Sequence, residues 1–179
     1  MTSVVEQIDW KQFGVITEDT SVNEFLLVYI VSTLIFTVFY FLNKMFLPGV
    51  MRAIFGEKGA FFSLSEKGKK EYCTRNVADL HSLVSAPLAI YCTFFACDDQ
   101  SKSIFSSNQC LVKPQKSMIY LILISSGYVT YDNFVCLYDL GYGFSMKNGG
   151  DFILHHVVGL IGALAVLVAG RQNVALSCS

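Results

Sequence analysis

The chain has 179 residues, of which 53% are hydrophobic and only 15% are charged, and its formal net charge is −1. Soluble domains carry about 25% charged residues, so this composition argues against one; the apolar residues gather in four blocks, which predicts an all-α integral membrane protein. The near-neutral charge excludes an electrostatic basis for binding nucleic acid.

The N-terminal part of the chain predicts a polar tail followed by the first membrane span. Residues 1–24 are mildly acidic, and no basic segment with an apolar run behind it begins the chain, so we expect no cleaved signal peptide. The first span is predicted at residues 25–46, which carry no charge before Lys44. We expect Pro48-Gly49 to end its helix.

A basic loop at residues 50–76 separates the first span from the second. From Lys44 to Arg75 there are seven Lys or Arg residues against three Glu residues, which predicts a cytosolic loop. This basic cluster either contacts anionic lipid or acts only as a topology signal. Ser65 is the expected N-cap of a short interfacial helix that leads into the second span, residues 77–97.

The second loop, residues 98–116, is expected on the lumenal side. Cys97 and Cys110 bracket it and could form a disulfide there, with two free thiols as the alternative. The third span, predicted at residues 117–138, has a polar middle. Its Ser125, Tyr128 and Asp132 lie at i, i+3 and i+7 and so share one helical face. That face should point to protein or to a wet cavity, because an ionised carboxylate against lipid is costly.

The fourth span, predicted at residues 152–169, carries no charge and begins with the pair His155 and His156. Its length is about 27 Å, close to the thickness of the hydrocarbon core. Gly159 and Ala163 have the spacing that allows close helix packing. Residues 171–179 are expected to be a C-terminal tail, and four spans place both termini outside the cytosol.

The ionisable residues of three spans are expected at one depth. Asp132 and the histidine pair lie near the cytosolic ends of consecutive spans, and His81 lies at a comparable level in the second span. A carboxylate beside an imidazole fixes its tautomer and raises its basicity, as in general base catalysis. The alternative is that each residue is hydrogen-bonded packing between helices.

The two histidines cannot act together on one small target. Adjacent helical residues point about 100° apart, so we expect one histidine to face Asp132 and the other to pack on a different helix. The same angle argues against a metal site on the pair, because two ligands on one helix are spaced four residues apart. No metal and no cofactor are expected.

Three stretches of the chain carry a resemblance to a known family. They are RNVADLHSLVSAPLAIY, SSGYVTYDNFV and DFILHHVVGL. In order and spacing they resemble the TLC-domain family, which includes the ceramide synthases, and the overall pattern is most similar to the small TLC-domain-containing proteins. The resemblance covers roughly residues 25–170. It implies a partial TLC-domain bundle of four helices, truncated at the C-terminus relative to the family fold.

The resemblance implies a protein of the endoplasmic reticulum that influences membrane lipid composition. An alternative it implies is an acyl-CoA-dependent N-acyltransferase of sphingoid bases, in which His155 or His156 deprotonates the amine and Asp132 orients it. A structural membrane protein without catalysis is a further alternative. Membrane lipids, acyl-CoA, and a partner subunit or a second copy are the expected partners. The substrate-binding positions implied are Arg75, His81, Ser125 and Tyr128.

Overall fold

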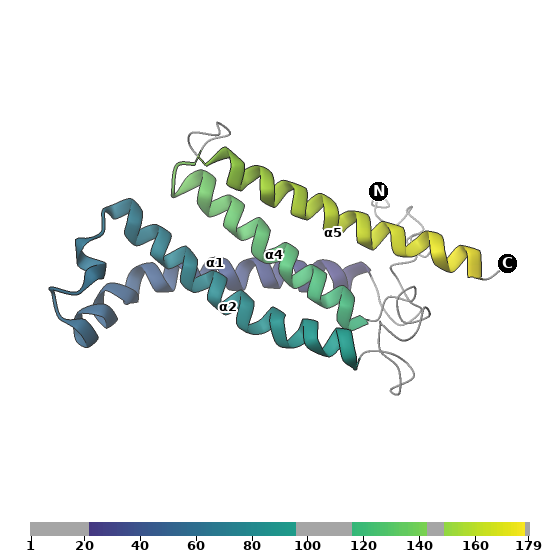
Figure 1. Cartoon of the computed structure of the whole chain (residues 1–179), viewed down its shortest axis with the longest axis horizontal. Helices are drawn as coiled ribbons and strands as arrows, with labels where there is room; N and C mark the ends of the chain where they lie inside the picture. Colours follow the sequence, from purple (N-terminus) through teal and green to yellow (C-terminus); the bar gives the residue numbers. More distant parts are fainter. Residues whose placement is uncertain (1–21, 96–115, 143–148, 178–179) are drawn as a thin grey trace, which may run out of the picture.

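The structure, a computed structural model, describes residues 22–95, 116–142 and 149–177, and gives side chains in the last helix up to residue 163. These ranges form four α-helices and one short 3-10 helix and contain no strand, so the all-α prediction is confirmed for them. The elements, labelled in Figure 1, are α1 (Val22–Phe55), η3 (Ala60–Ser63), α2 (Glu66–Phe94), α4 (Lys116–Tyr138) and α5 (Gly150–Ser177).

Helix α4 is at the centre of the bundle and packs against α1, α2 and α5, while α1 also packs against α2. Lys116 at the start of α4 pairs with Glu24 at the start of α1 at 2.7 Å. Asp139, directly after the end of α4, pairs with Lys44, which lies further along α1, at 2.6 Å. Helices α1 and α4 are therefore parallel. Figure 1 shows α1 and α2 as a long hairpin and α5 beside α4.

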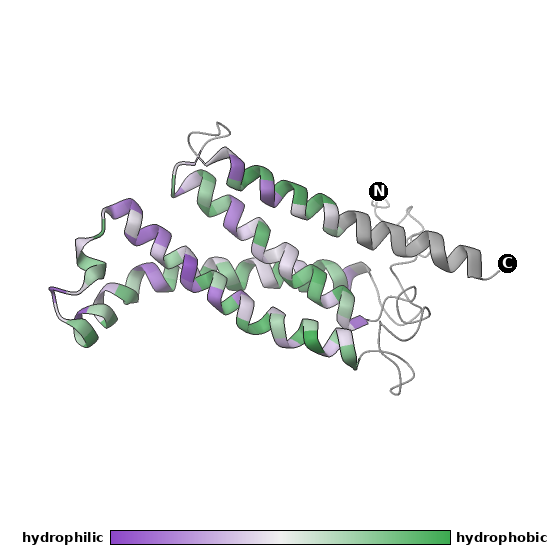
Figure 2. Cartoon of the chain, in the orientation of Figure 1, coloured by the Kyte–Doolittle hydropathy of each residue, from purple (hydrophilic) through white to green (hydrophobic). Residues whose placement is uncertain are grey.

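Two of the helices, α1 and α2, are long and apolar enough to cross a membrane. Only 17% of the most apolar window of α1 and 11% of that of α2 are buried, whereas a core helix of a soluble protein is mostly buried. Figure 2 shows that apolar residues cover most of α1, while the start of α2 is hydrophilic. The spans predicted on α4 and α5 stay predictions.

Several helix ends differ from the expected ones. Pro48 was expected to end α1, and this is wrong: the helix continues to Phe55, because an interior proline removes one hydrogen bond and does not by itself stop a helix. The helix ends instead at Gly56, which has a φ of +69° and donates its N–H to the Arg52 carbonyl at 3.0 Å.

The N-cap prediction at Ser65 is confirmed, since its hydroxyl accepts a hydrogen bond from the Gly68 N–H at 3.1 Å. The expected interfacial helix and second span are one continuous helix, α2. The residues expected as a C-terminal tail continue α5 as far as Ser177. Cys97 and Cys110 lie outside the described residues.

Helices α1 and α4 approach each other closely at Gly127. A Cβ atom there would lie 2.8 Å from the Ser32 Cβ and 3.0 Å from the Thr33 backbone nitrogen, so only glycine fits. The close packing expected at Gly159 is not found, because a Cβ atom there would meet no described atom within 4 Å. The small residue that allows close helix packing is thus Gly127 of α4, which lies against α1, and not Gly159 of α5.

Asp139, directly after α4, joins three helices through what we call the Asp139 cluster: Tyr40, Lys44, Lys70 and Asp139. Its Oδ2 accepts hydrogen bonds from Tyr40 and Lys44 at 2.6 Å each, and its Oδ1 accepts one from Lys70 at 2.7 Å. Burial raises the pKa of this carboxyl, but the hydrogen bonds from Lys44, Lys70 and Tyr40 outweigh burial and hold the pKa well below its usual range. The carboxylate is therefore charged in the folded protein.

Replacing Gly127 by alanine is expected to destabilise the detergent-solubilised protein by about 1–3 kcal/mol, because the methyl group must displace the α1 backbone. Thermal unfolding measures the change. Gly159→Ala is the matched control, since it makes the same substitution inside a helix with open space around it. Equal effects of the two substitutions would contradict the close approach of α1 and α4.

Replacing Asp139 by asparagine is expected to lower the free energy of unfolding by about 1–3 kcal/mol near neutral pH, because the charged hydrogen bonds to two lysines are lost. The pKa of Asp139 is depressed in the folded state, so its contribution is complete above the unfolded value of about 3.9 and is lost progressively as the pH falls from there toward the folded-state pKa. The difference in unfolding free energy between the wild type and Asp139→Asn should therefore be constant from about pH 7 to about pH 5 and become smaller by about pH 3.

The control is Glu66→Gln, which breaks an exposed ion pair with Lys69. Exposed pairs contribute about 0–1 kcal/mol, so this variant should resemble the wild type at every pH. A constant difference between the wild type and Asp139→Asn across the pH range would refute the role of the carboxylate charge.

Candidate functional site

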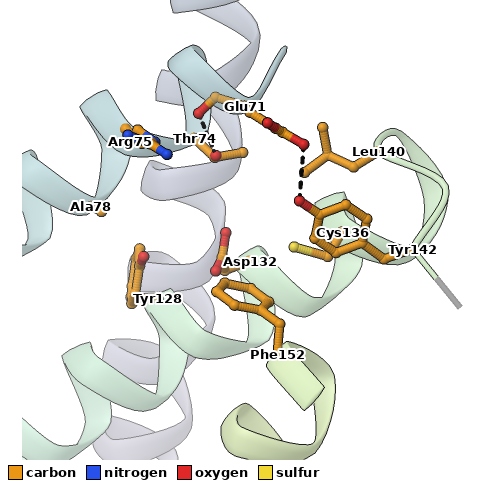
Figure 3. Close-up of a pocket in the computed structure, with 10 residues that line it drawn as sticks. All are labelled: Glu71, Thr74, Arg75, Ala78, Tyr128, Asp132, Cys136, Leu140, Tyr142 and Phe152. Carbon is orange, nitrogen blue, oxygen red and sulfur yellow. Dashed lines mark hydrogen bonds between the residues drawn. The ribbon is translucent and has the colours of Figure 1, made fainter. Parts of the chain in front are cut away.

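A pocket of about 240 Å³ lies where α2, α4 and the start of α5 meet. Its walls mix charged and hydroxyl groups with aromatic rings, which is the composition of a site that binds a polar group beside an apolar one. Figure 3 shows the side chains around this opening. The lining residues are Glu71, Thr74, Arg75 and Ala78 of α2, Tyr128, Asp132 and Cys136 of α4, Leu140 and Tyr142 after α4, and Phe152 of α5.

Asp132 lines this pocket, and His156, which does not line it, lies against Asp132. The Asp132 side chain is almost fully buried, with a residue exposure of 2%, and its Oδ2 lies 3.6 Å from the His156 Nδ1. This distance exceeds that of a hydrogen bond, and His156 Nδ1 has no hydrogen-bond partner among the described residues. The Phe152 ring packs on His156 with the centroids 4.3 Å apart. The imidazole therefore lies between the carboxylate and an aromatic wall of the pocket.

His155 has a different environment from its neighbour. It is exposed, and its ring centroid lies 5.9 Å from that of His156. The expectation that one histidine faces Asp132 agrees with the position of His156. The expected packing of the other on a further helix is not seen in the described part of the chain, where the outer side of α5 carries no additional helix.

The other residues expected in the site form a second cluster beside the pocket. His81 Nε2 lies 3.2 Å from the Ser125 hydroxyl, and the imidazole stacks on the Tyr128 ring with centroids 4.3 Å apart and planes 8° apart. Tyr128 in turn lines the pocket with Asp132. Ser125, Tyr128 and Asp132 thus lie along one face of α4, as predicted. His81 of α2 contacts this face at Ser125 and Tyr128.

The rim of the pocket depends on Tyr142, which follows α4. Its hydroxyl donates to the Glu71 carboxylate at 3.0 Å, and the Lys67 Nζ lies 4.6 Å from the centre of its ring. The ring lies against Gly149, where a Cβ atom would come within 2.8 Å of it. Burial raises the pKa of Tyr142 to about 12, and the hydrogen bond to Glu71 acts in the same direction. The phenol is therefore a hydrogen-bond donor at neutral pH.

Sequence reasoning missed much of this rim. Glu71, Tyr142 and Phe152 come from a loop flank and two helix ends, and no local pattern brings them together. The one available signal was the spacing of Glu71 and Arg75, four residues apart on α2, which places both on the side of the helix that faces the pocket. Arg75 was expected at the site and does line the pocket, and its side chain is exposed.

The structure thus brings Arg75, Tyr128 and Asp132 to one pocket, with His156 against Asp132, and leaves His155 outside. Among the described residues, no group of three or more His, Cys, Asp or Glu side chains could hold a metal ion. The chemistry that the site can offer is proton transfer and hydrogen bonding. Comparisons of the chain with protein-family models, with curated proteins and with solved structures give no match.

Proposed function

We propose that this chain is a multi-pass membrane protein of the TLC type, which binds the polar part of a membrane lipid in the Asp132 pocket and so contributes to membrane lipid homeostasis. The observation that carries the proposal is the buried Asp132 carboxylate beside His156 in a pocket between helices. Ionisable residues inside a membrane bundle are expensive and are a functional site by default. The resemblance of the three motifs supports a lipid as the ligand and the endoplasmic reticulum as the location.

Two ionic clusters on α1 support the placement in a membrane. Glu24 pairs with Lys116 and accepts a hydrogen bond from Tyr120 at one end, and Lys44 belongs to the Asp139 cluster at the other. The 19 residues between Glu24 and Lys44 carry no charge. A separation of 20 helical positions corresponds to about 30 Å, the thickness of the hydrocarbon core. The charges therefore lie where the two interfaces of a bilayer would be.

A second candidate function is acyl transfer from acyl-CoA to a lipid amine, which the contact between Asp132 and His156 favours. A protonated Nδ1 facing Asp132 would leave Nε2 as the nitrogen that can accept a proton. The amine nitrogen would attack the thioester carbonyl, the C–N bond would form, the C–S bond would break, and His156 would pass the amine proton to the departing CoA thiolate. Asp132 would orient the imidazole in this scheme.

Lipid profiles test the first proposal. Cells that lack the protein are complemented with the wild type, His156→Ala, Asp132→Asn or His155→Ala, at matched protein levels. The wild type and His155→Ala should restore the lipid profile, whereas His156→Ala and Asp132→Asn should not, because only these two alter the buried pair. His155→Ala is the matched control, since it removes the adjacent, exposed imidazole.

Restoration by every variant would mean that the pocket is not the working site, and an unchanged profile in cells lacking the protein would favour a purely structural role. His156→Gln accompanies His156→Ala, because it fills the same buried space without a basic ring. A loss of function with Ala and a recovery with Gln would point to packing instead of proton transfer.

A direct assay tests the second candidate. The purified protein in lipid nanodiscs is given a long-chain acyl-CoA with a sphingoid base, and CoA release is measured. General base catalysis contributes about 10²–10⁴-fold, so His156→Ala should lower the rate by at least the lower figure while His155→Ala leaves it within a few-fold of the wild type. Release of CoA that is equal in all variants, or absent from the wild type, would exclude this reaction for this chain.

A further inference from the structure

The end of the α1–α2 hairpin, which we call the hairpin tip (residues 45–70), extends past α4 and α5 in Figure 1. Along α1, an exposed apolar ridge recurs at every fourth position from Leu26 to Ile54 and does not stop at Lys44. It spans 28 helical positions, or about 42 Å, whereas the hydrocarbon core is about 30 Å thick. Its members are Leu26, Ile30, Leu34, Val38, Leu42, Phe46, Val50 and Ile54.

The apolar side chains of the tip belong to a folded unit. Phe61 is buried, with its ring 5.5 Å from that of Phe62 and 5.6 Å from that of Tyr72. The Arg52 guanidinium lies 5.7 Å from the centre of the Phe62 ring. The exposed residues outside this cluster are therefore held outward by the fold. They are Met45, Phe46, Val50, Ile54, Phe55 and Leu64.

The charge of the tip identifies the surface that these side chains fit. Residues 45–70 carry five Lys or Arg residues against two Glu residues. Arg52 pairs with Glu57 at 3.6 Å, Lys69 pairs with Glu66, and Lys70 pairs with Asp139. Lys58 and Lys67 form no ion pair within the described residues. On the last turns of α1, Phe46, Val50 and Ile54 lie on one side and Arg52 points away from them. Apolar side chains next to uncompensated cations are the pattern of a segment that lies in the headgroup layer of an anionic membrane.

We propose that the hairpin tip lies on the anionic surface of the leaflet from which it emerges, with Phe46, Val50, Ile54 and Phe55 inserted at the boundary of headgroups and acyl chains. The proposal rests on the membrane placement given above. If α1 stood upright, the 11 residues after Lys44 would rise about 16 Å, beyond a headgroup layer of about 5–8 Å. Pro48 leaves the Lys44 carbonyl without its helical partner and supplies the point at which α1 can bend toward the leaflet.

Tryptophan fluorescence in nanodiscs tests this proposal. The single native Trp10 is first removed by Trp10→Phe, and Ile54→Trp then reports on the tip, with Phe55→Trp as an aromatic-for-aromatic second reporter. Leu34→Trp, at an exposed position midway along the span, is the membrane reference, and Glu57→Trp is the reference for a polar position on the tip. Lipids brominated in their acyl chains and aqueous acrylamide serve as quenchers, in discs of phosphatidylcholine with or without phosphatidylserine.

In discs with phosphatidylserine, the indoles of Ile54→Trp and Phe55→Trp should be quenched by brominated lipid and protected from acrylamide, and Glu57→Trp should show the opposite. Omitting phosphatidylserine, or adding Arg52→Glu with Lys58→Glu, should reduce the lipid quenching of the tip reporters by about two-fold or more, without changing that of Leu34→Trp.

Four results would overturn the proposal. Quenching of both tip reporters by acrylamide alone would place the tip in water. Protection from both quenchers would mean that a second copy or another protein covers it. A lack of lipid quenching in Leu34→Trp would remove the membrane placement itself, together with the inference. Lipid quenching of Leu34→Trp with none at the tip would refute the inference and leave the proposed function standing.

Discussion

The fold depends on one carboxylate that is shared by three helices. Asp139 receives hydrogen bonds from two side chains of α1 and one of α2 while it belongs to the end of α4. Helix α5 begins a short distance further along the chain, and Tyr142 between them packs on the α2 side of the pocket rim. A displacement at Asp139 would therefore reach the pocket through Tyr142 and Glu71. The cluster that aligns the helices and the rim of the site are parts of one arrangement.

The helices could be predicted from the sequence because length and apolar content are local properties. The order of the helices follows from the positions of the apolar blocks. The polar face of α4 follows from helical spacing, and the N-cap at Ser65 follows from side-chain chemistry. The end of α1 could not be predicted in the same way. Proline weakens a helix by an amount that the surrounding contacts can exceed. The helix ends instead at Gly56, eight residues later, where the backbone adopts a φ of +69°.

The same distinction between local and non-local properties applies to the candidate site. Matched depth in consecutive helices predicted that Asp132 would face a histidine, since depth can be counted along the chain. Which histidine faces it depends on the rotation of α5 about its axis. In that rotation Ile153 is buried, and the Phe152 ring lies 6.2 Å from the Tyr142 ring after α4. Glu71 and Tyr142 meet only because the loop after α4 folds back over α2. No local pattern in the chain encodes that meeting.

The parallel packing of α1 and α4 also sets the order in which the molecule can assemble. Tyr29 on α1 bonds to Thr130 on α4 at 2.9 Å, and 101 positions of chain separate the two. Ribosomes add about 5–20 residues per second, so α1 waits roughly 5–20 seconds for the helix that fits against it. During that interval the backbone of α1 at Tyr29 and Ser32, which only a glycine can approach, is open to lipid or to a chaperone. The close contact of α1 with α4 at Gly127 can therefore form only after α4 has been synthesised.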